Sequence, residues 1–324
     1  MIELVSGVND AGRKLDRVLR KALPQYPLSL IHRLLRQKKV TINGKPAIHN
    51  TIVRDRDVIQ INIKVNKQIS VNQNFLKVNV NEITELPEII WRGVGIIIFN
   101  KQPGIATHGT NSLETIVQLY LAGTLPPSLS FKPGPLHRLD KQTSGAIAFS
   151  QTLEGARWFS RLLHEKRLTK TYLAIVEGIV CKEELWEDKL IRDKQAQKTY
   201  TGNGENSKEA VTVVKPLVFN DNYTLIEVKI STGRTHQIRA QSAAHGHPLA
   251  GDRKYGGKKF PDGYSMPQSH GDDYCLHAWK IECKELAENV PLEFPKLVIA
   301  PLPENFTSRI NLLFGKLKMP ILIV

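Results

Sequence analysis

The segment His137–Gly145, which reads HRLDKQTSG, places one carboxylate, Asp140, between cations and just before an apolar stretch typical of a strand. Arg138 and Lys141 favour the ionised form of this carboxylate, because nearby positive charge stabilises an anion. An ionised carboxylate can act as a nucleophile or as a general base. The alternative is that Asp140 only shapes the turn before Gly145, since Asp is frequent in loops.

A second segment, Lys170–Gly178, reads KTYLAIVEG and alternates with a period of two. This alternation predicts a strand with Tyr172 on the same face as Ala174 and Val176. The alternative for Tyr172 is an ordinary core or edge aromatic residue whose hydroxyl reaches water.

A third segment, Ser231–Gly257, predicts a turn at Gly233 and a helix that begins near His236. It contains two arginines, Arg234 and Arg239. Five positions turn a helix by about 140° and reverse the face of a strand, so we expect only one arginine to reach the small site around Asp140. The other would serve phosphate or backbone, unless both simply belong to a basic surface.

No spacing in the chain predicts a metal or cofactor site. Three histidines lie close together, but without a paired ligand motif (His236, His245 and His247). Three scattered cysteines form neither a zinc pattern nor a disulfide framework (Cys181, Cys275 and Cys283). The glycine clusters lack a nucleotide-binding fingerprint. We therefore expect no metal and no cofactor.

The chain has 324 residues, which suits two domains, and its 45 Lys and Arg outnumber 31 Asp and Glu to give a formal charge of +14. Such a surface attracts polyanions. The window from Arg13 to Lys45 holds ten basic side chains and one acid, Asp16, a net charge of +9. The first part of the chain is therefore the strongest candidate for nucleic-acid binding.

The same window predicts two short helices separated by Pro24 and Pro27, then a hairpin at Asn43-Gly44. We expect a unit that is helical first and stranded second. Its apolar stripes are narrow enough to be used in packing the helices together, which favours nucleic acid over a membrane surface. A merely solvated basic face is the alternative to both.

This unit resembles the αL RNA-binding module first described in a ribosomal small-subunit protein, through RKLDRVL and RLLRQKKVTINGK. The resemblance implies that four basic residues of the second helix and following loop contact phosphates (Arg33, Arg36, Lys38 and Lys39). We expect an RNA-binding domain over residues 1–65, a linker over 66–86 and a catalytic domain over 87–324.

The longest apolar runs are far shorter than the ~20 residues of a membrane span, so we expect no membrane association. The first residues contain Glu3 and Asp10 and do not resemble a secretory signal. Together with the few cysteines, these features predict a cytoplasmic protein.

The order HRLD with TSG, then KTY, then GRTHQIR with GHP and GDxxYGG, resembles the RluA-type family of pseudouridine synthases over nearly the whole chain. Phe99–Gly109 (FNKQPGIATHG) and Cys275–Glu282 (CLHAWKIE) fit the same family. The chain departs from it at Gln142, where an acid is frequent. The segment Gly257–Asp273 is predicted to be a loop of unassigned role.

The resemblance implies cofactor-independent isomerisation of a uridine in RNA, in which the C–N glycosidic bond breaks and a C–C bond forms. Asp140 matches the catalytic aspartate, as nucleophile or as base. Tyr172 matches the tyrosine that stacks on uracil and assists a late proton transfer. Arg239 matches the ion-pair partner of the aspartate, with Arg234 as the second choice.

Further expectations follow from the resemblance. Arg138 would fill the space left by an extruded base, and His137 and Lys141 would contact phosphates, unless His137 is structural and bonded to backbone. The fold would be α+β, with a mixed, mainly antiparallel sheet and flanking helices. The protein would act as a monomer on 23S ribosomal RNA or a pre-ribosomal particle. Transfer RNA, a non-catalytic ribosome-assembly role and an aspartate-dependent hydrolase are the alternatives.

Overall fold

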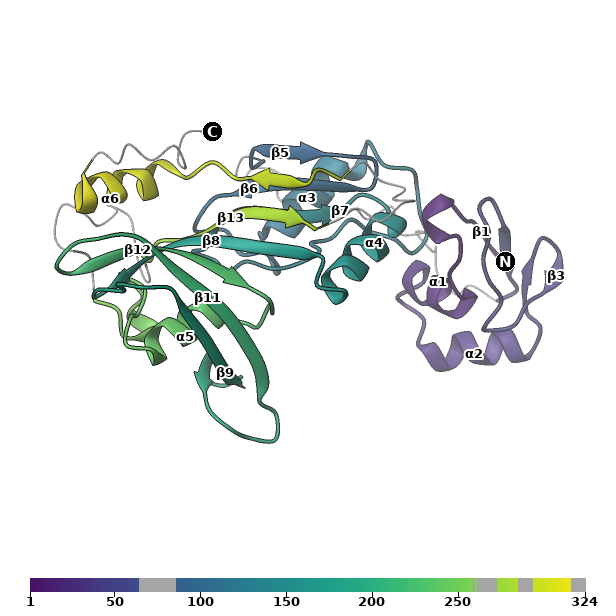
Figure 1. The fold of residues 1–324 in the computed structure, drawn as a ribbon. Helices are drawn as coiled ribbons and strands as arrows, with labels where there is room; N and C mark the ends of the chain where they lie inside the picture. The colour runs from purple at the N-terminus through teal and green to yellow at the C-terminus, as the bar shows by residue number, and fades with distance from the viewer. Residues whose placement is uncertain (64–85, 259, 261–272, 285–293, 316–324) are drawn as a thin grey trace.

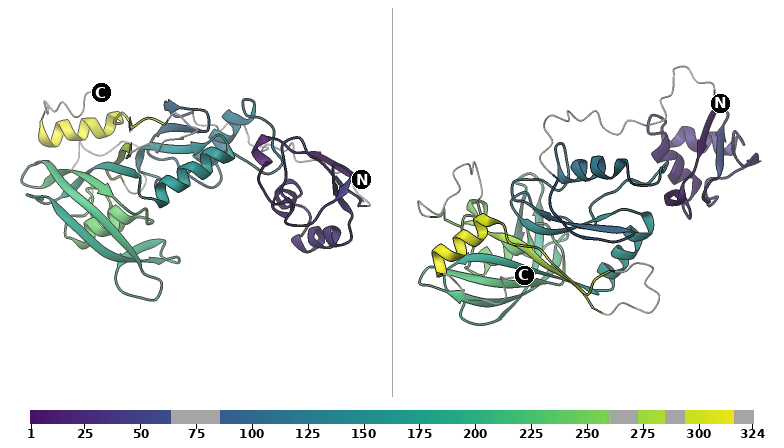
Figure 2. Two further views of the ribbon diagram at one scale, coloured as in Figure 1. Left: turned by 45° about the vertical axis from the view of Figure 1, so that its right-hand side comes forward. Right: turned by 90° about the horizontal axis from the view of Figure 1, so that it is seen from above.

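The computed structural model describes residues 1–63, 86–258, 260, 273–284 and 294–315. The predicted linker over 66–86, except for residue 86, and most of the Gly257–Asp273 loop lie outside these ranges. Figures 1 and 2 show a small N-terminal unit beside a larger body built on one long sheet.

The N-terminal unit combines two helices with a four-stranded antiparallel sheet of order β1-β4-β2-β3. Its elements are β1 (Ile2–Val5), α1 (Leu15–Ala22), α2 (Leu28–Arg36), β2 (Val40–Ile42), β3 (Lys45–Pro46) and β4 (Val58–Ile61). Asn43 and Gly44 both have positive φ, at 50° and 76°, as a tight hairpin turn requires. The expectation of helices before strands was wrong, because β1 precedes both helices and pairs with β4.

The body contains ten strands in the order β10-β9-β11-β12-β8-β13-β7-β6-β5, with β14 paired to β13. All these pairs are antiparallel except β13 with β7, so the expected α+β fold with a mixed, mainly antiparallel sheet is confirmed. The strands are β5 (Ile89–Arg92), β6 (Ile96–Lys101), β7 (Ser144–Ser150), β8 (Leu168–Glu177), β9 (Glu184–Asp193), β10 (Lys198–Thr201), β11 (Lys208–Phe219), β12 (Tyr223–Ile230), β13 (Leu276–Cys283) and β14 (Leu297–Ile299).

Alternation along the strands builds an apolar core on each face of the sheet. On β6, Ile97 and Phe99 pack with helix α3, while Ile96 and Ile98 pack with helix α4 on the opposite face. Tyr172 and its face-sharing neighbours on β8 belong to the α3 side, which helix α5 also covers, and helix α6 covers the other side. The four helices are α3 (Leu113–Ala122), α4 (Leu153–His164), α5 (Gln237–Ala244) and α6 (Glu304–Phe314).

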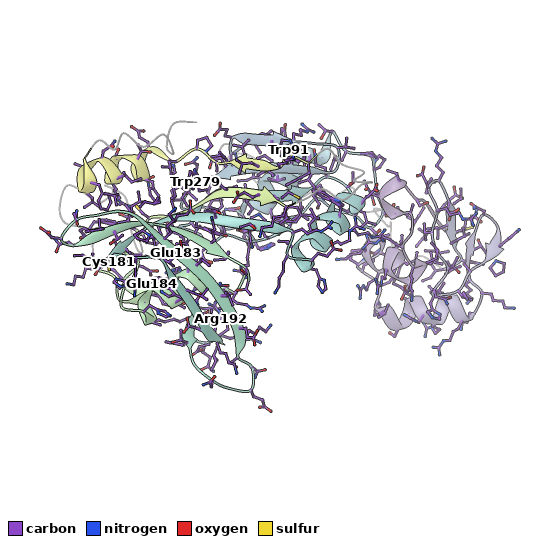
Figure 3. All side chains as sticks on the ribbon, viewed as in Figure 1. Trp91, Cys181, Glu183, Glu184, Arg192 and Trp279 are labelled. Carbon is purple, nitrogen blue, oxygen red and sulfur yellow. The ribbon has the colours of Figure 1, made fainter. Side chains whose placement is uncertain are left out.

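The strands β9 and β11 extend away from the rest of the body in Figure 1. Figure 3 places Arg192 toward the outer end of β9, far from Glu183 and Glu184 at its start. Helix α5 lies against the inner side of these strands, where Ala240 packs with Leu190.

Gly145 follows the HRLDKQTS segment and opens the parallel contact between β7 and β13. Its φ is +105°, and a Cβ at this position would lie 2.3 Å from the Ala278 carbonyl oxygen. Only glycine combines this backbone conformation with this close approach. The close packing of β7 on β13 therefore fixes where the Asp140 loop ends.

Among the residues that the structure describes, no helix has the length and apolar character needed to cross a membrane.

His277 on β13 is fully buried, and its Nε2–H donates to the Ala300 carbonyl at 3.1 Å while Nδ1 contacts the Ser144 hydroxyl at 2.9 Å. Burial lowers the pKa of His277 to about 4, against about 6.5 in an unfolded chain. The unfolded state therefore binds the extra proton between about pH 6.5 and 4, and stability falls as the pH falls through that window.

We expect His277→Gln, whose amide can make the same two contacts, to weaken this acid dependence. The fall in the free energy of unfolding between pH 7 and pH 4.5 should shrink by about 2 kcal/mol. Urea unfolding at both pH values measures it, with the exposed His164→Gln as control. Equal acid sensitivity in both variants would contradict the buried neutral state of His277.

Candidate active site

The loop that carries Asp140 is held through its backbone. The Thr107 hydroxyl donates to the Leu139 carbonyl at 2.7 Å and accepts the Leu139 N–H at 3.2 Å. The Thr143 N–H donates to the Asp140 carbonyl at 3.1 Å. These bonds hold the backbone of the loop on both sides of the Asp140 side chain.

Lys101, at the end of β6, lies beneath the same loop and is fully buried. Its Nζ donates to the carbonyls of Gln102 at 2.8 Å, Lys141 at 2.9 Å and Thr143 at 2.8 Å. Burial lowers the pKa of Lys101 to about 7, and the nearby Asp140 opposes that shift. The three acceptors match the three donors of an ammonium group, so Lys101 pins the loop.

Arg239 on α5 connects Asp140 to a second carboxylate, Asp252. Its Nε and Nη2 donate to the two Asp252 oxygens at 2.6 and 2.7 Å, and its Nη1 lies 3.6 Å from Asp140 Oδ2. Burial opposes the charge, but hydrogen bonding to Asp252 and the surrounding negative groups raise the pKa of Arg239 above its usual value. The bidentate contact orients the guanidinium toward Asp140.

Two tyrosine rings confine this guanidinium. The Arg239 Cζ lies 4.4 Å from the centre of the Tyr274 ring and 4.9 Å from that of Tyr255. Such cation–π contacts favour the charged group at close range. The sequence interpretation gave no role to Lys101, Asp252 or Tyr255, although all three lie in the quoted motifs FNKQPGIATHG and GDxxYGG.

His236, one of the three neighbouring histidines for which the sequence predicts no metal site, lies beside Asp140 together with Arg239. Its Nε2 lies 3.8 Å from Asp140 Oδ2, and its Nδ1 contacts the Tyr255 hydroxyl at 2.8 Å and Arg192 at 3.5 Å. Burial lowers the pKa of His236 to about 4, with Asp140 opposing, so the ring is neutral at pH 7. Because Arg192 can only donate, Nδ1 is the acceptor and the ring proton lies on Nε2, toward Asp140.

Asp140 and Tyr172 both line a small cavity of about 50 Å³. Burial, and then the charge of Asp140, raise the pKa of Tyr172 far above its ordinary value, so the hydroxyl stays protonated. The remaining lining comes from the Asp140 loop, β12, α5 with its preceding turn, and β13 (Arg138, Leu139, Thr143, Ile230, Arg234, His236, Gln237, Ile238, Arg239 and Leu276).

The expectation that only one of the two arginines reaches the small site was wrong, because Arg234 and Arg239 line the same cavity. Arg234 precedes the helix, and His236 between them adopts a left-handed φ of 53°, so neither helical nor strand spacing applies. They differ in role: Arg239 pairs with Asp140, whereas the Arg234 Nε donates to the Glu209 carbonyl at 3.0 Å.

The other predicted contacts separate into exposed and structural residues. Arg138 and Lys141 are exposed beside Asp140, and Arg138 lines the cavity. His137 Nε2 accepts the Ala148 N–H at 3.1 Å, and its ring stacks on Phe159. Burial lowers the pKa of His137 to about 3, so the structure favours its structural role over the phosphate contact.

The four basic residues of the N-terminal unit are exposed on the end of α2 and the turn after it (Arg33, Arg36, Lys38 and Lys39). In both Figures 1 and 2 this unit lies at the opposite end of the molecule from α5. The structure therefore does not bring these residues to Asp140.

Within the described part of the chain, no cluster of histidine, cysteine and acidic side chains could hold a metal ion. His245 instead pairs with Asp188 at 3.1 Å, and His247 Nδ1 contacts the Glu177 carbonyl.

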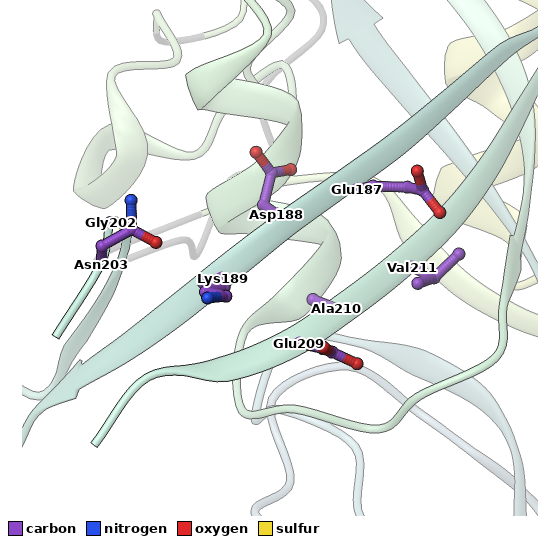
Figure 4. Close-up of a pocket in the computed structure, with 8 residues that line it drawn as sticks. All are labelled: Glu187, Asp188, Lys189, Gly202, Asn203, Glu209, Ala210 and Val211. Atoms are coloured by element: carbon purple, nitrogen blue, oxygen red, sulfur yellow. The ribbon is translucent and has the colours of Figure 1, made fainter. Parts of the chain in front are cut away.

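A separate hollow of about 580 Å³ lies over β9 and β11 (Figure 4). Three acids contribute to its lining, Glu187, Asp188 and Glu209, with Lys189 as the one lining cation among the described residues. Carboxylates repel phosphate, so this hollow does not suit an anionic polymer.

The sequence of the chain matches a known class of RNA-modifying isomerase. The RNA pseudouridylate synthase family matches residues 95–244. The ribosomal large subunit pseudouridine synthase D of Neisseria meningitidis is 31% identical over 94% of this chain and 79% of its own length. The chain therefore belongs to the RNA pseudouridylate synthase family, whose members convert uridine to pseudouridine.

Two further comparisons agree with this assignment. An RNA pseudouridine synthase of Bacillus subtilis is 30% identical over 79% of this chain and 83% of its own length. The solved human RNA pseudouridylate synthase domain containing 4 shares the fold, with a TM-score of 0.57 and 20% identity over 72% of this chain and 94% of its own.

Proposed function

We propose that this isomerase modifies uridines of large-subunit (23S) ribosomal RNA, with Asp140 as its catalytic carboxylate. One observation carries the assignment: Asp140 lies 3.6 Å from the Arg239 guanidinium in a cavity that it shares with Tyr172. Among the described lining residues Asp140 is the acidic side chain, and a carboxylate can either attack the nucleoside or remove a sugar proton.

The neighbours of Asp140 supply orientation and proton control. Arg239, held by Asp252, fixes the direction of the carboxylate, and the neutral His236 presents an N–H from the other side. Tyr172 keeps its proton at neutral pH and can stack on the uracil. After the C–C bond forms, C5 loses a proton and N1 gains one, and the hydroxyl can relay this transfer by giving its own proton and receiving another. The proposed isomerisation uses only these side chains and no cofactor.

The target uridine must leave its stack to reach Asp140, which costs a few kcal/mol and favours loops and irregular RNA. Arg138 is exposed at the cavity and is our candidate for the space left in the RNA. Lys141 and Arg234 would contact flanking phosphates.

The ribosomal substrate is supported by the names of the relatives, among them ribosomal large subunit pseudouridine synthases of Neisseria meningitidis and Haemophilus influenzae. We also propose that the protein acts as a monomer. We place its action in the cytoplasm, on free ribosomal RNA or a pre-ribosomal particle. Residues 1–65 would act as the RNA-binding domain, joined through 66–86 to the catalytic domain.

Tritium release tests this proposal. Purified protein is incubated with large-subunit ribosomal RNA carrying tritium at uracil C5, and released tritium and free uracil are both measured. Release without free uracil is the expected result. Free uracil would indicate hydrolysis of the glycosidic bond. Tritium release from transfer RNA but not from ribosomal RNA would show that transfer RNA, rather than ribosomal RNA, is the substrate.

The exposed cations of α2 and the turn after it give a second prediction. Changing Arg33, Arg36, Lys38 and Lys39 to Gln should flatten the dependence of RNA affinity on salt. The slope of log K against log salt is negative, and each lost phosphate contact reduces its magnitude by about 0.7–0.9. The magnitude of the slope should therefore decrease by roughly three. Filter binding between 50 and 200 mM salt measures it.

The matched control removes four exposed lysines of the body, Lys182, Lys215, Lys284 and Lys296, at equal cost in charge. Equal slopes for the two variants would show that net charge, rather than a surface of the N-terminal unit, attracts the RNA.

A further inference from the structure

A groove of about 820 Å³ runs along the junction between the N-terminal unit and the body. Helix α1 contributes Arg20 and Lys21 to one side, and the segment before β7 contributes Phe131 and Lys132 to the other. Its volume falls within the ~300–1,000 Å³ range of pockets that hold small ligands, so a nucleotide fits.

The walls of this groove are fixed by a buried carboxylate that joins the two units. Asp10 is fully buried and accepts hydrogen bonds from the Ser128 hydroxyl at 2.7 Å, the Leu129 N–H at 2.8 Å, and the Ser130 N–H and hydroxyl at 2.9 and 2.6 Å. It also accepts the Gly7 N–H at 3.0 Å. Both oxygens of Asp10 are thus occupied by neutral donors.

Other contacts reinforce the junction. The Arg13 Nη1 donates to the Ser130 carbonyl at 3.0 Å and to its hydroxyl at 2.9 Å, and Asn9 Oδ1 accepts the Leu153 N–H at 2.9 Å. A Cβ on Gly7 would lie 2.2 Å from the Pro127 carbonyl oxygen, so the two backbones approach too closely for any other residue. The groove is therefore a defined surface between the units.

The charges around the groove favour an anionic ligand. Burial lowers the pKa of Arg13, Asp10 opposes this, and the charges of Arg157, Arg17 and Arg20 lower it further. These cations repel one another at the junction. Among the described residues that line the groove, the one acid is Glu114, and it is already bonded to His108 at 2.8 Å.

The groove also contains an aromatic ring. Phe131 is half-buried and lines the groove between Leu129 and Lys132. A basic groove with an aromatic platform is the combination that binds single-stranded nucleic acid, because phosphates meet the cations while a base stacks on the ring.

We propose that the junction groove binds a single-stranded segment of the substrate RNA outside the modified uridine. Arg20, Lys21 and Lys132 contact its phosphates, and a base stacks on Phe131. This inference rests on the proposed action on RNA, and it extends the binding surface from α2 across the junction toward the catalytic body.

The test compares two full-length variants that each lose three positive charges. The first changes Arg20, Lys21 and Lys132 to Gln, and the control changes Lys182, Lys215 and Lys284 to Gln. All six side chains are exposed, so neither variant should lose its fold, and thermal unfolding checks this. The probe is a large-subunit ribosomal RNA fragment with single-stranded flanks.

In the groove variant the magnitude of the slope of log K against log salt should decrease by about two, since each single-strand phosphate contact contributes about 0.7. Phe131→Ala should weaken binding about 5- to 100-fold, and Phe131→Trp should restore it, because the ring supplies the stacking. The proposal would be overturned if the groove variant and the control variant had equal salt slopes and Phe131→Ala bound RNA with wild-type affinity.

The two proposals fail in different ways. If the wild-type protein releases no tritium from any RNA, the proposed activity is wrong, while a difference between the two triple variants would still support the groove. If tritium is released and the two variants bind alike, the groove alone is wrong.

Discussion

Replacing Asp140 by Asn should lower the rate of tritium release by about 10⁴-fold or more, while RNA affinity stays within about twofold of the wild type. The amide keeps the size of the carboxylate but can act neither as nucleophile nor as base. Affinity persists because the removed charge is negative and the ligand is a polyanion. Single-turnover tritium release and filter binding with the same RNA separate the two effects.

Asp55→Asn serves as the control, since it removes one exposed carboxylate of the N-terminal unit and should leave both measurements near the wild type. If Asp140→Asn lost binding as strongly as turnover, Asp140 would be holding the fold rather than performing chemistry. Unchanged turnover would remove it from the mechanism.

Asp252→Asn should lower the rate at saturating RNA by about 100-fold with little change in KM. Asp252 does not line the cavity, but it holds Arg239 through two bonds of 2.6 and 2.7 Å. An amide cannot receive both N–H groups, so the guanidinium shifts relative to Asp140. A displacement on the order of 1 Å at a catalytic group costs about 100-fold in rate.

The control for this positioning role is Asp188→Asn, which acts on the same helix at a different place. Asp188 accepts from Gln241 of α5 at 2.7 Å and pairs with His245. If Asp188→Asn lowers the rate as much as Asp252→Asn, both act through the stability of α5. A rise in KM at constant rate would instead place Asp252 in RNA binding.

The local patterns of the sequence predict much of the fold that positions these residues. Alternation alone places Tyr172 on one face of β8, and the structure buries it with Ala174 and Val176 in one cluster. The Asn43-Gly44 turn and the apolar stripes of α1 and α2 are also local signals. Each depends on neighbours in the sequence, which periodicity and turn chemistry describe well.

The parts that the sequence does not predict depend on distant partners. Strand β1 has four residues and exists through its pairing with β4, more than fifty residues later. A lysine at the end of a strand normally implies solvent, yet Lys101 is fully buried because three carbonyls surround its Nζ. The left-handed turn at His236 brings Arg234 back to the cavity, against any regular spacing.

The parallel contact between β7 and β13 has a consequence for synthesis of the chain. It joins Ser144 to His277, 133 residues later, so the Asp140 loop gains this support only after β13 has been made. The N-terminal unit closes its sheet within the first 61 residues and can fold much earlier, since domains generally fold in the order of synthesis. If the N-terminal unit binds RNA as proposed, polypeptides interrupted before β13 would hold RNA without modifying it, and would compete with the finished enzyme for its substrate.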